Sequence, residues 1–284
     1  MQATAFKLAE IVPGETAILP AEMTMVYPSA ARVPSRDKHY LVALPWHDYY
    51  LRRVPHPYRH FFQFVLPHLG ARTTNVHTAV SVGMLDELIR TSGLIVNRRA
   101  VYFALILHDS GWSKMSEQEI ADSLKTRALL HPKNHGAQEK HDVLGGQIAR
   151  RVLAEYGFEP ALRQDERELI VALVENHSRG ALLDTAGVML PEMQMVHDAD
   201  RLWSYSHENF WQDTVRKGVP ANTYLDTIDV AIPGYFASDA GRKMARALVA
   251  ERRAEIEAIS VADLLRQMLP QEKVPAMRAR RATV

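Results

Sequence analysis

The chain has 284 residues and a mass of 32.1 kDa, enough to bury a substantial hydrophobic core. Its formal net charge of +1 provides no global attraction to nucleic acid or to an anionic membrane. The composition combines 13 histidines with no cysteine, which excludes disulfides, cysteine nucleophiles, iron–sulfur clusters and zinc–thiolate sites. A metal site in this chain must therefore use imidazole nitrogen and carboxylate oxygen.

The sequence shows no targeting or membrane-spanning pattern. The longest apolar runs, residues 101–107 and 169–174, are far shorter than the ~18–20 residues that a membrane-spanning helix needs. The first 25 residues lack the apolar segment of a secretory signal. There is also no phosphate-binding glycine loop and no GxSxG motif. We therefore expect a cytoplasmic protein with no membrane partner.

Residues 1–55 differ in pattern from the rest of the chain. They are rich in proline and show little sustained periodicity, which predicts an irregular arm or cap. We expect a helical domain over residues 56–268 and a basic C-terminal tail over residues 269–284.

Helical periodicity dominates after residue 55. Val76, Val80, Met84 and Leu88 follow each other at four-residue steps and predict a helix that begins near Thr74. A second helix is predicted from about residue 98 to 108, and residues 116–119 form a capping-box pattern that opens a third. The further predicted helices are centred on residues 144–153, 169–174, 195–202, 208–217, 221–229 and 238–258. No series of alternating strands is present, so the predicted fold class is all-α.

The histidines divide into two groups by their context. Eight lie in the arm, in loops or at predicted surface positions, and the following are expected to have no special role: His39, His47, His56, His60, His68, His131, His135 and His207. Five others lie on or beside apolar helical stripes: His77, His108, His141, His177 and His197. Any one of these five, taken alone, fits a hydrogen-bonded core residue.

Two aspartates change this interpretation. Asp109 follows the apolar run of residues 101–107, and Asp200 lies between apolar positions of its helix. An ionised carboxylate in an apolar setting is costly unless it is paired or bound to a metal. Together with His77, His108, His141 and His177, these aspartates would form a site suited to Fe, Mn, Co, Ni or Zn. Six ligands exceed the needs of one catalytic ion and fit two, with Asp109 placed to bridge.

The order and context of these residues resemble a known family. His77, His108-Asp109 and Asp200 resemble the H…HD…D signature of the HD-domain superfamily of metal-dependent phosphohydrolases. Residues 105–111 resemble its apolar HD-x-G segment, and residues 199–202 its A-D-R-L segment. Residues 141–149 resemble its H-x-x-x-G-[AG]-x-I-A helix, and residues 174–177 the later helix that ends in histidine. The resemblance covers roughly residues 74–258 and implies an HD-type helical bundle.

The sequence departs from the family pattern in several places. Many members follow HD-x-G with lysine, whereas Trp112 stands there and Lys114 comes two residues later. The GYP extension of cyclic-di-nucleotide phosphodiesterases and a nucleotide-synthetase domain are both absent. The presence of His141 and His177 resembles the two-metal subset, which contains both phosphohydrolases and mixed-valence di-iron oxygenases that cleave C–C or C–P bonds.

The resemblance implies a ligand set and a mechanism. His77, His108, Asp109 and Asp200 would hold a first ion, and His141 and His177, with Asp109 bridging, a second. A metal-activated hydroxide would attack phosphorus in line. Asp109, Lys114 and Arg201 are the predicted catalytic residues. Lys114, Arg179 and Arg201 would face the phosphate, and His197 and Asp198 would orient a ligand from behind. Trp112 and Trp203 would line the pocket or pack in the core.

Three functions remain open at this stage. The first is hydrolysis of a phosphate ester of a nucleotide or other small metabolite, the second is oxidative cleavage by a di-iron centre, and the third is a non-catalytic HD-fold binding module. Retention of every ligand position argues against the third. A nucleic-acid partner would rest on basic and aromatic residues near positions 49–62. We instead expect these to form an aromatic cap over the domain or a homodimer contact.

Overall fold

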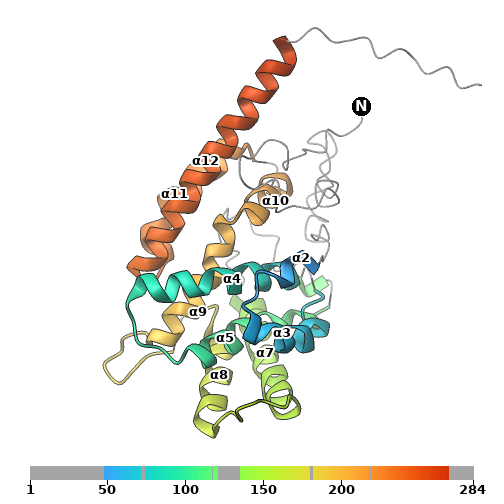
Figure 1. Ribbon diagram of the computed structural model, residues 1–284, viewed down its shortest axis with the longest axis vertical. Coiled ribbons are helices and arrows are strands. Elements are labelled where there is room, and N and C mark those ends of the chain that lie inside the picture. Colours follow the sequence, from blue (N-terminus) through green and yellow to red (C-terminus); the bar gives the residue numbers. More distant parts are fainter. Residues whose placement is uncertain are drawn as a thin grey trace, which may run out of the picture.

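Helices account for almost all of the regular structure in the residues that the computed structural model describes, which are 48–71, 74–116, 118–120, 135–179, 182–217 and 219–268 (Figure 1). Within these residues there is no strand, and one isolated β-bridge joins Leu183 to Met189. The predicted all-α class is confirmed. The helices are α2 (Asp48–Leu51), η4 (His56–Tyr58), α3 (Arg59–Val65), η5 (Leu66–His68), α4 (Thr74–Ser92), α5 (Arg98–Leu107), η6 (Ser110–Lys114), α7 (His135–Glu155), α8 (Gln164–Asn176), α9 (Pro191–Leu202), η7 (Trp203–Tyr205), α10 (His207–Lys217), α11 (Ala221–Tyr235) and α12 (Asp239–Met268).

Helix α5 forms the centre of the bundle. The side chain of Asn97 caps its first turn by accepting a 3.1 Å hydrogen bond from the Ala100 N–H. Every residue from 100 to 107 is buried, because α3, α4, α8 and α9 all pack against this helix. An apolar run that is buried on all sides fixes the helix rigidly, so the residues that directly follow it also have fixed positions.

The predicted helices that lie within the described residues occur at the expected places, with two differences in length. For the helix expected to open at residues 116–119, residues 121–134 lie outside the described part of the chain. The α4 stripe is confirmed, with Val76, Val80 and Leu88 buried and Met84 partly buried. Helix α11 continues past the predicted end at residue 229, because Ile232 and Tyr235 extend its buried stripe. Helix α12 continues past residue 258 to Met268 and projects from the bundle in Figure 1.

The segment before α4 contributes to the core. Tyr50, Phe61 and Phe62 are essentially inaccessible to solvent, and the Tyr58 ring stacks on Tyr102 with centroids 4.0 Å apart. Rings in these positions are not available to stack on nucleotide bases. The part of the predicted arm at residues 48–55 contains α2, whereas residues 1–47 and the predicted tail at 269–284 lie outside the described residues. Of the described helices, none is long and apolar enough to cross a membrane.

Candidate metal centre

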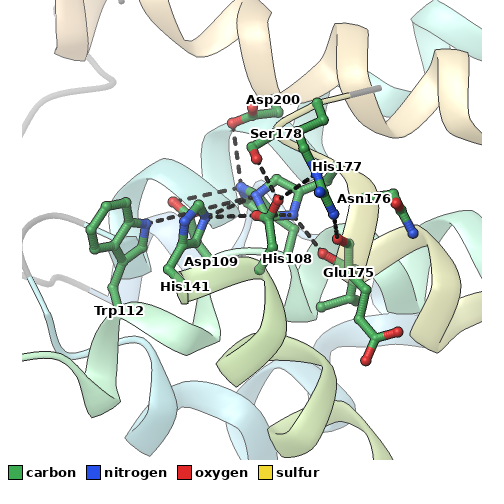
Figure 2. A network of polar contacts seen from close by, with 12 residues as sticks. His108, Asp109, Trp112, His141, Glu175, Asn176, His177, Ser178 and Asp200 are labelled. Atoms are coloured by element: carbon green, nitrogen blue, oxygen red, sulfur yellow. Dashed lines mark hydrogen bonds and ion pairs between the residues drawn. The ribbon is translucent and has the colours of Figure 1, made fainter. Parts of the chain in front are cut away.

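Four histidines and two aspartates meet between the helices of the bundle (Figure 2). His77 comes from α4 and Asp200 from α9, while His141 comes from α7. His108 and His177 are the residues that end α5 and α8, and Asp109 precedes η6. The packing of α5 on α8 and α9, and of α7 on α8 and η6, brings these elements together. The six residues predicted as ligands therefore form one cluster.

Asp109 lies at the middle of the cluster, and its two oxygens face different histidines. Oδ2 is 3.0 Å from His77 Nδ1 and 3.7 Å from His108 Nε2. Oδ1 is 3.5 Å from His141 Nε2 and 3.7 Å from His177 Nε2. Asp109 therefore presents one oxygen to each of two histidine pairs, and it meets His77 at Nδ1, whereas Asp200 meets the same ring at Nε2.

The spacing of the inward-facing atoms suits metal coordination. Ligand atoms about 2.0–2.2 Å from one ion lie roughly 3.0–3.5 Å from each other in tetrahedral or octahedral geometry. Asp200 Oδ1 is 3.0 Å from His77 Nε2 and 3.4 Å from His108 Nε2. At the other end of the cluster, His141 Nε2 is 3.2 Å from His177 Nε2. Both ends of the cluster therefore have ligand-like spacing.

Two of the histidines are oriented in the same way by helix ends. His108 Nδ1 lies 2.6 Å from the Leu105 carbonyl, and His177 Nδ1 lies 2.7 Å from the Val174 carbonyl. Carbonyls in the last turn of a helix lack an intrahelical partner, so each accepts a hydrogen bond from the ring that follows it. A proton on Nδ1 leaves the Nε2 lone pair free to point into the cluster. Metal-binding histidines commonly donate their other ring N–H to a backbone carbonyl in this way.

Several polar atoms of the cluster are buried without a hydrogen-bond partner. These include Nε2 of His77, Nε2 of His108 and Nδ1 of His141. The His77 Nε2 contact with Asp200 is short but does not have the geometry of a hydrogen bond. Buried unsatisfied polar groups are costly in free energy. A cation bound among these atoms would compensate this cost at Nε2 of His77 and His108, so the residues present fit a metal ion.

The cluster is closed on one side and partly open on the other. The side chains of His108, His141 and His177 are at most 3% exposed, whereas that of Asp200 is 22% exposed. Trp203 stacks on His77 with ring centroids 5.1 Å apart, beside the open side. Asp200 therefore marks the more solvent-exposed side of the cluster.

The charges of the cluster shift the pKa values of its members. Burial alone would lower the pKa of His77, but its contacts with Asp109 and Asp200 raise it to about 9. Burial also opposes protonation of His177, whose pKa is nevertheless raised to about 10 by Asp142, Asp109 and Asp200. Burial would raise the carboxyl pKa values of Asp109 and Asp200, yet the neighbouring histidines hold both well below the usual range. The carboxylates are thus ionised at neutral pH.

The three cations predicted to face a phosphate lie in different places. Arg201 lies over the Tyr235 ring, 4.7 Å from its centroid, and its Nη1 donates to the Tyr235 carbonyl. Arg179 is at the closed end, with its Nε 3.8 Å from Asp142 Oδ2. Lys114 is exposed. Its charge helps, after burial, to lower the pKa of His68. Of these three cations, only Arg201 is next in sequence to Asp200, the most exposed residue of the cluster.

The contacts of Asp198 do not support its predicted role behind a metal ligand. Its carboxylate accepts hydrogen bonds from the backbone N–H groups of Ala237 and Ser238 and from the Ser238 hydroxyl. His197 Nδ1 lies 3.0 Å from Asp198 Oδ1. The side chain of Asp198 points away from Asp200 because residues two positions apart lie on nearly opposite faces of a helix. Its hydrogen bonds fix the loop that precedes α12.

The sequence did not predict a place in the cluster for Asp142, and for Trp112 it left two possible positions open. Asp142 is completely buried, and its Oδ1 lies 3.3 Å from His141 Nε2. A sequence signal existed, because His141-Asp142 repeats the His-Asp dipeptide of residues 108–109. Trp112 was predicted to line the pocket or pack in the core. It stacks on His141 and donates from Nε1 to Asp109 Oδ1 at 3.0 Å.

Comparisons of this chain with protein-family models, with curated proteins and with solved structures gave no match.

Proposed function

We propose that this protein is a two-metal phosphohydrolase that cleaves a phosphate ester of a small metabolite or nucleotide. The observation that carries the proposal is the position of Asp109, whose two oxygens face the His77–His108 pair and the His141–His177 pair. The resemblance of the surrounding segments to HD-domain phosphohydrolases points to the same chemistry. The metals would be divalent ions from the set Fe, Mn, Co, Ni and Zn.

Each residue has a defined part in this proposal. His77, His108 and Asp200 would hold the first ion and His141 and His177 the second, while Asp109 would bind both. Ions at such a site lower the pKa of a bound water and neutralise phosphoryl charge. The helix-end hydrogen bonds of His108 and His177 keep their Nε2 atoms directed inward, so the site is organised before substrate arrives.

The substrate would approach from the side of Asp200. This is the more exposed side of the cluster, and Arg201 lies next to it over the Tyr235 ring. Burial, opposed by the Arg201 charge, raises the pKa of Tyr235 to about 12, so its hydroxyl remains protonated at neutral pH. A guanidinium and a phenol hydroxyl are suitable groups to contact an anionic phosphate.

The decisive experiment is a screen of phosphate esters with protein reconstituted in Mn²⁺, Fe²⁺ or Zn²⁺, run with and without oxygen. We expect oxygen-independent release of inorganic phosphate from at least one class of ester. Asp109→Ala should lose turnover by a factor of about 1,000 or more, because it removes the bridge and a ligand of each ion. Its metal content should also fall from about two ions per chain toward zero.

Two outcomes would contradict the proposal. Turnover that requires both Fe²⁺ and oxygen would assign the centre to oxidative cleavage instead. Full metal occupancy and full turnover in Asp109→Ala would remove the bridging role. Asp165→Ala is a matched control, because Asp165 is 71% exposed and pairs with Arg163 at the start of α8, and it should retain both metal ions.

A further inference from the structure

We propose that Asp142 is a direct ligand of the second metal ion, which makes it a seventh protein ligand in the cluster. The inference rests on the proposed two-metal function and deepens it, because it assigns the second ion a carboxylate that it does not share. The second ion would then be held by His141, His177 and Asp142, with Asp109 bridging to the first ion.

The burial of Asp142 is the first observation. Its side chain is 0% exposed, and its Oδ1 is buried without a hydrogen-bond partner. The free-energy cost of burying a carboxylate oxygen in this way is large unless a cation compensates it. Among the described arginines and lysines, Arg179 approaches this carboxylate, with its Nε 3.8 Å from the other oxygen, Oδ2. Oδ1 itself lies 3.3 Å from His141 Nε2 and 3.4 Å from His177 Nδ1, and neither contact has the geometry of a hydrogen bond.

The direction of Oδ1 is the second observation. It lies 3.3 Å from His141 Nε2, and that nitrogen lies 3.2 Å from His177 Nε2 and 3.5 Å from Asp109 Oδ1. These three separations from His141 Nε2 fall in the range of about 3.0–3.5 Å expected between ligands of one ion. His141, Asp142 and His177 also offer ligand atoms that all lie within 4.8 Å of one another.

The remaining contacts of Asp142 hold it in this orientation. Ser178 follows His177 directly, and its hydroxyl donates a 2.5 Å hydrogen bond to Asp142 Oδ2. One oxygen is thus occupied by a neutral donor, and the other is directed at the histidines. Metal-binding carboxylates commonly have this division, with one oxygen on the ion and the other on an outer hydrogen-bond donor.

A ligand role for Asp142 has a consequence for charge. Two divalent ions bring four positive charges, and Asp109, Asp142 and Asp200 would supply three negative ones. The loaded centre would retain a small net positive charge, which favours an anionic substrate without leaving strong uncompensated charge in a buried site.

Metal stoichiometry tests the proposal directly. Metal-free wild-type protein and variants would be titrated with Mn²⁺ by calorimetry, and their metal content would be measured by elemental analysis after removal of free ion. We expect two ions in the wild type and about one in Asp142→Asn, with second-site affinity reduced about tenfold or more. Asp142→Ser is a second carboxylate-free variant in case the first misfolds, and it should also bind one ion. Asp142→Glu retains a carboxylate and should bind two.

Two control variants show what retention and loss of the second ion look like in the same measurement. Asp198→Asn removes an equally buried carboxylate that bonds to residues 237 and 238, and it should retain two ions. His141→Ala removes a histidine that the proposed function assigns to the second ion, and it should bind one ion. Two ions with wild-type affinity in Asp142→Asn would overturn the ligand role, because asparagine keeps a hydrogen-bond acceptor. Equal Mn²⁺ content in Asp142→Asn and Asp142→Glu would also overturn it. Fewer than two ions in the wild type would instead contradict the two-metal centre itself.

Discussion

At the scale of single residues, the cluster depends on side chains that restrain Asp109. Its backbone has φ −96° and ψ 6°, a sparsely populated region in which active-site residues are often found. Trp112 lies one turn further along η6 and donates from its indole N–H to Asp109 Oδ1. The same indole stacks on His141 with ring centroids 4.3 Å apart. Trp112 therefore contacts both the central carboxylate and the His141 ring.

Trp112→Phe tests this link. Phenylalanine retains an aromatic face for His141 but lacks the donor, so Asp109 would lose one restraint. We expect metal affinity to fall by about 10–100-fold, as is typical when an outer hydrogen bond to a ligand is removed. Calorimetric titration with Mn²⁺ measures this. Trp203→Phe is the matched control, because Trp203 stacks on His77, and it should change affinity less. Equal losses in the two variants would show that the hydrogen bond has no special role.

The six residues of the cluster could be predicted from the sequence because each stands at a fixed register to an apolar stripe. His141 precedes Ile148 by seven residues and His177 follows Ile170 by seven, so each shares the buried face of its helix. Asp142 was not predicted, because a residue next to a ligand on a helix normally points elsewhere. Its burial arises from the packing of α8 against α7, which places Ser178 over it. Periodicity within one helix contains no information about this contact.

At the scale of elements, the close approach of η6 to α7 positions both Asp109 and His141. Gly111 is the contact point, where an added Cβ would lie 1.9 Å from the His141 carbonyl oxygen and 2.7 Å from the Gly145 nitrogen. Both neighbours are backbone atoms of α7, which cannot move aside independently of the helix. Glycine at position 111 is thus a steric requirement for the approach of these two elements.

Gly111→Ala should therefore separate η6 from α7. We expect a loss of stability of at least about 1–3 kcal/mol, the usual cost of forcing extra atoms into a packed interior. This corresponds to a fall in Tm of several degrees, taking roughly 2–4 °C per kcal/mol. The separation should also reduce Mn²⁺ binding, since Asp109 and His141 lie on opposite sides of the contact. Thermal unfolding and elemental analysis measure the two effects.

Gly157→Ala is the control, because a Cβ at that exposed position meets no heavy atom within 4 Å. Its Tm should remain close to that of the wild type. A Gly111→Ala protein with wild-type Tm and two bound ions would contradict the steric argument.

The positions of the helices could be predicted better than their ends. The start of α5 follows from Asn97, and Ser116 and Glu119 form the predicted capping box through reciprocal hydrogen bonds. The extension of α11 could not be predicted in this way, because Pro233 lies inside the helix near its end. Proline normally argues against a helix interior, and only tertiary burial of Ile232 and Tyr235 outweighs that preference.

At the scale of the whole molecule, the buried cluster links folding to protons and metal ions. In the metal-free protein, protonated His77 and His177 balance the charges of the buried carboxylates, which is why their pKa values are raised to about 9 and 10. A group whose pKa is higher in the folded state contributes stability that is complete below its unfolded pKa, here 6.5. This contribution is lost as the pH rises through the folded pKa.

The metal-free protein should therefore become less stable between pH 6.5 and pH 9.5, by an amount of order 1 kcal/mol or more for these two histidines. Metal ions act in the opposite direction, because they bind only neutral imidazole and take over the charge balance once the protons have left. With saturating Mn²⁺, the Tm should fall less over the same range than it does in the presence of a chelator.

Because Mn²⁺ and protons compete for the same imidazoles, Mn²⁺ binding at pH 7 should release protons. Calorimetric titrations in buffers of different ionisation enthalpy detect this release. A chelated protein whose Tm stays constant or rises from pH 6.5 to 9.5 would show that these histidines are not protonated in the folded state.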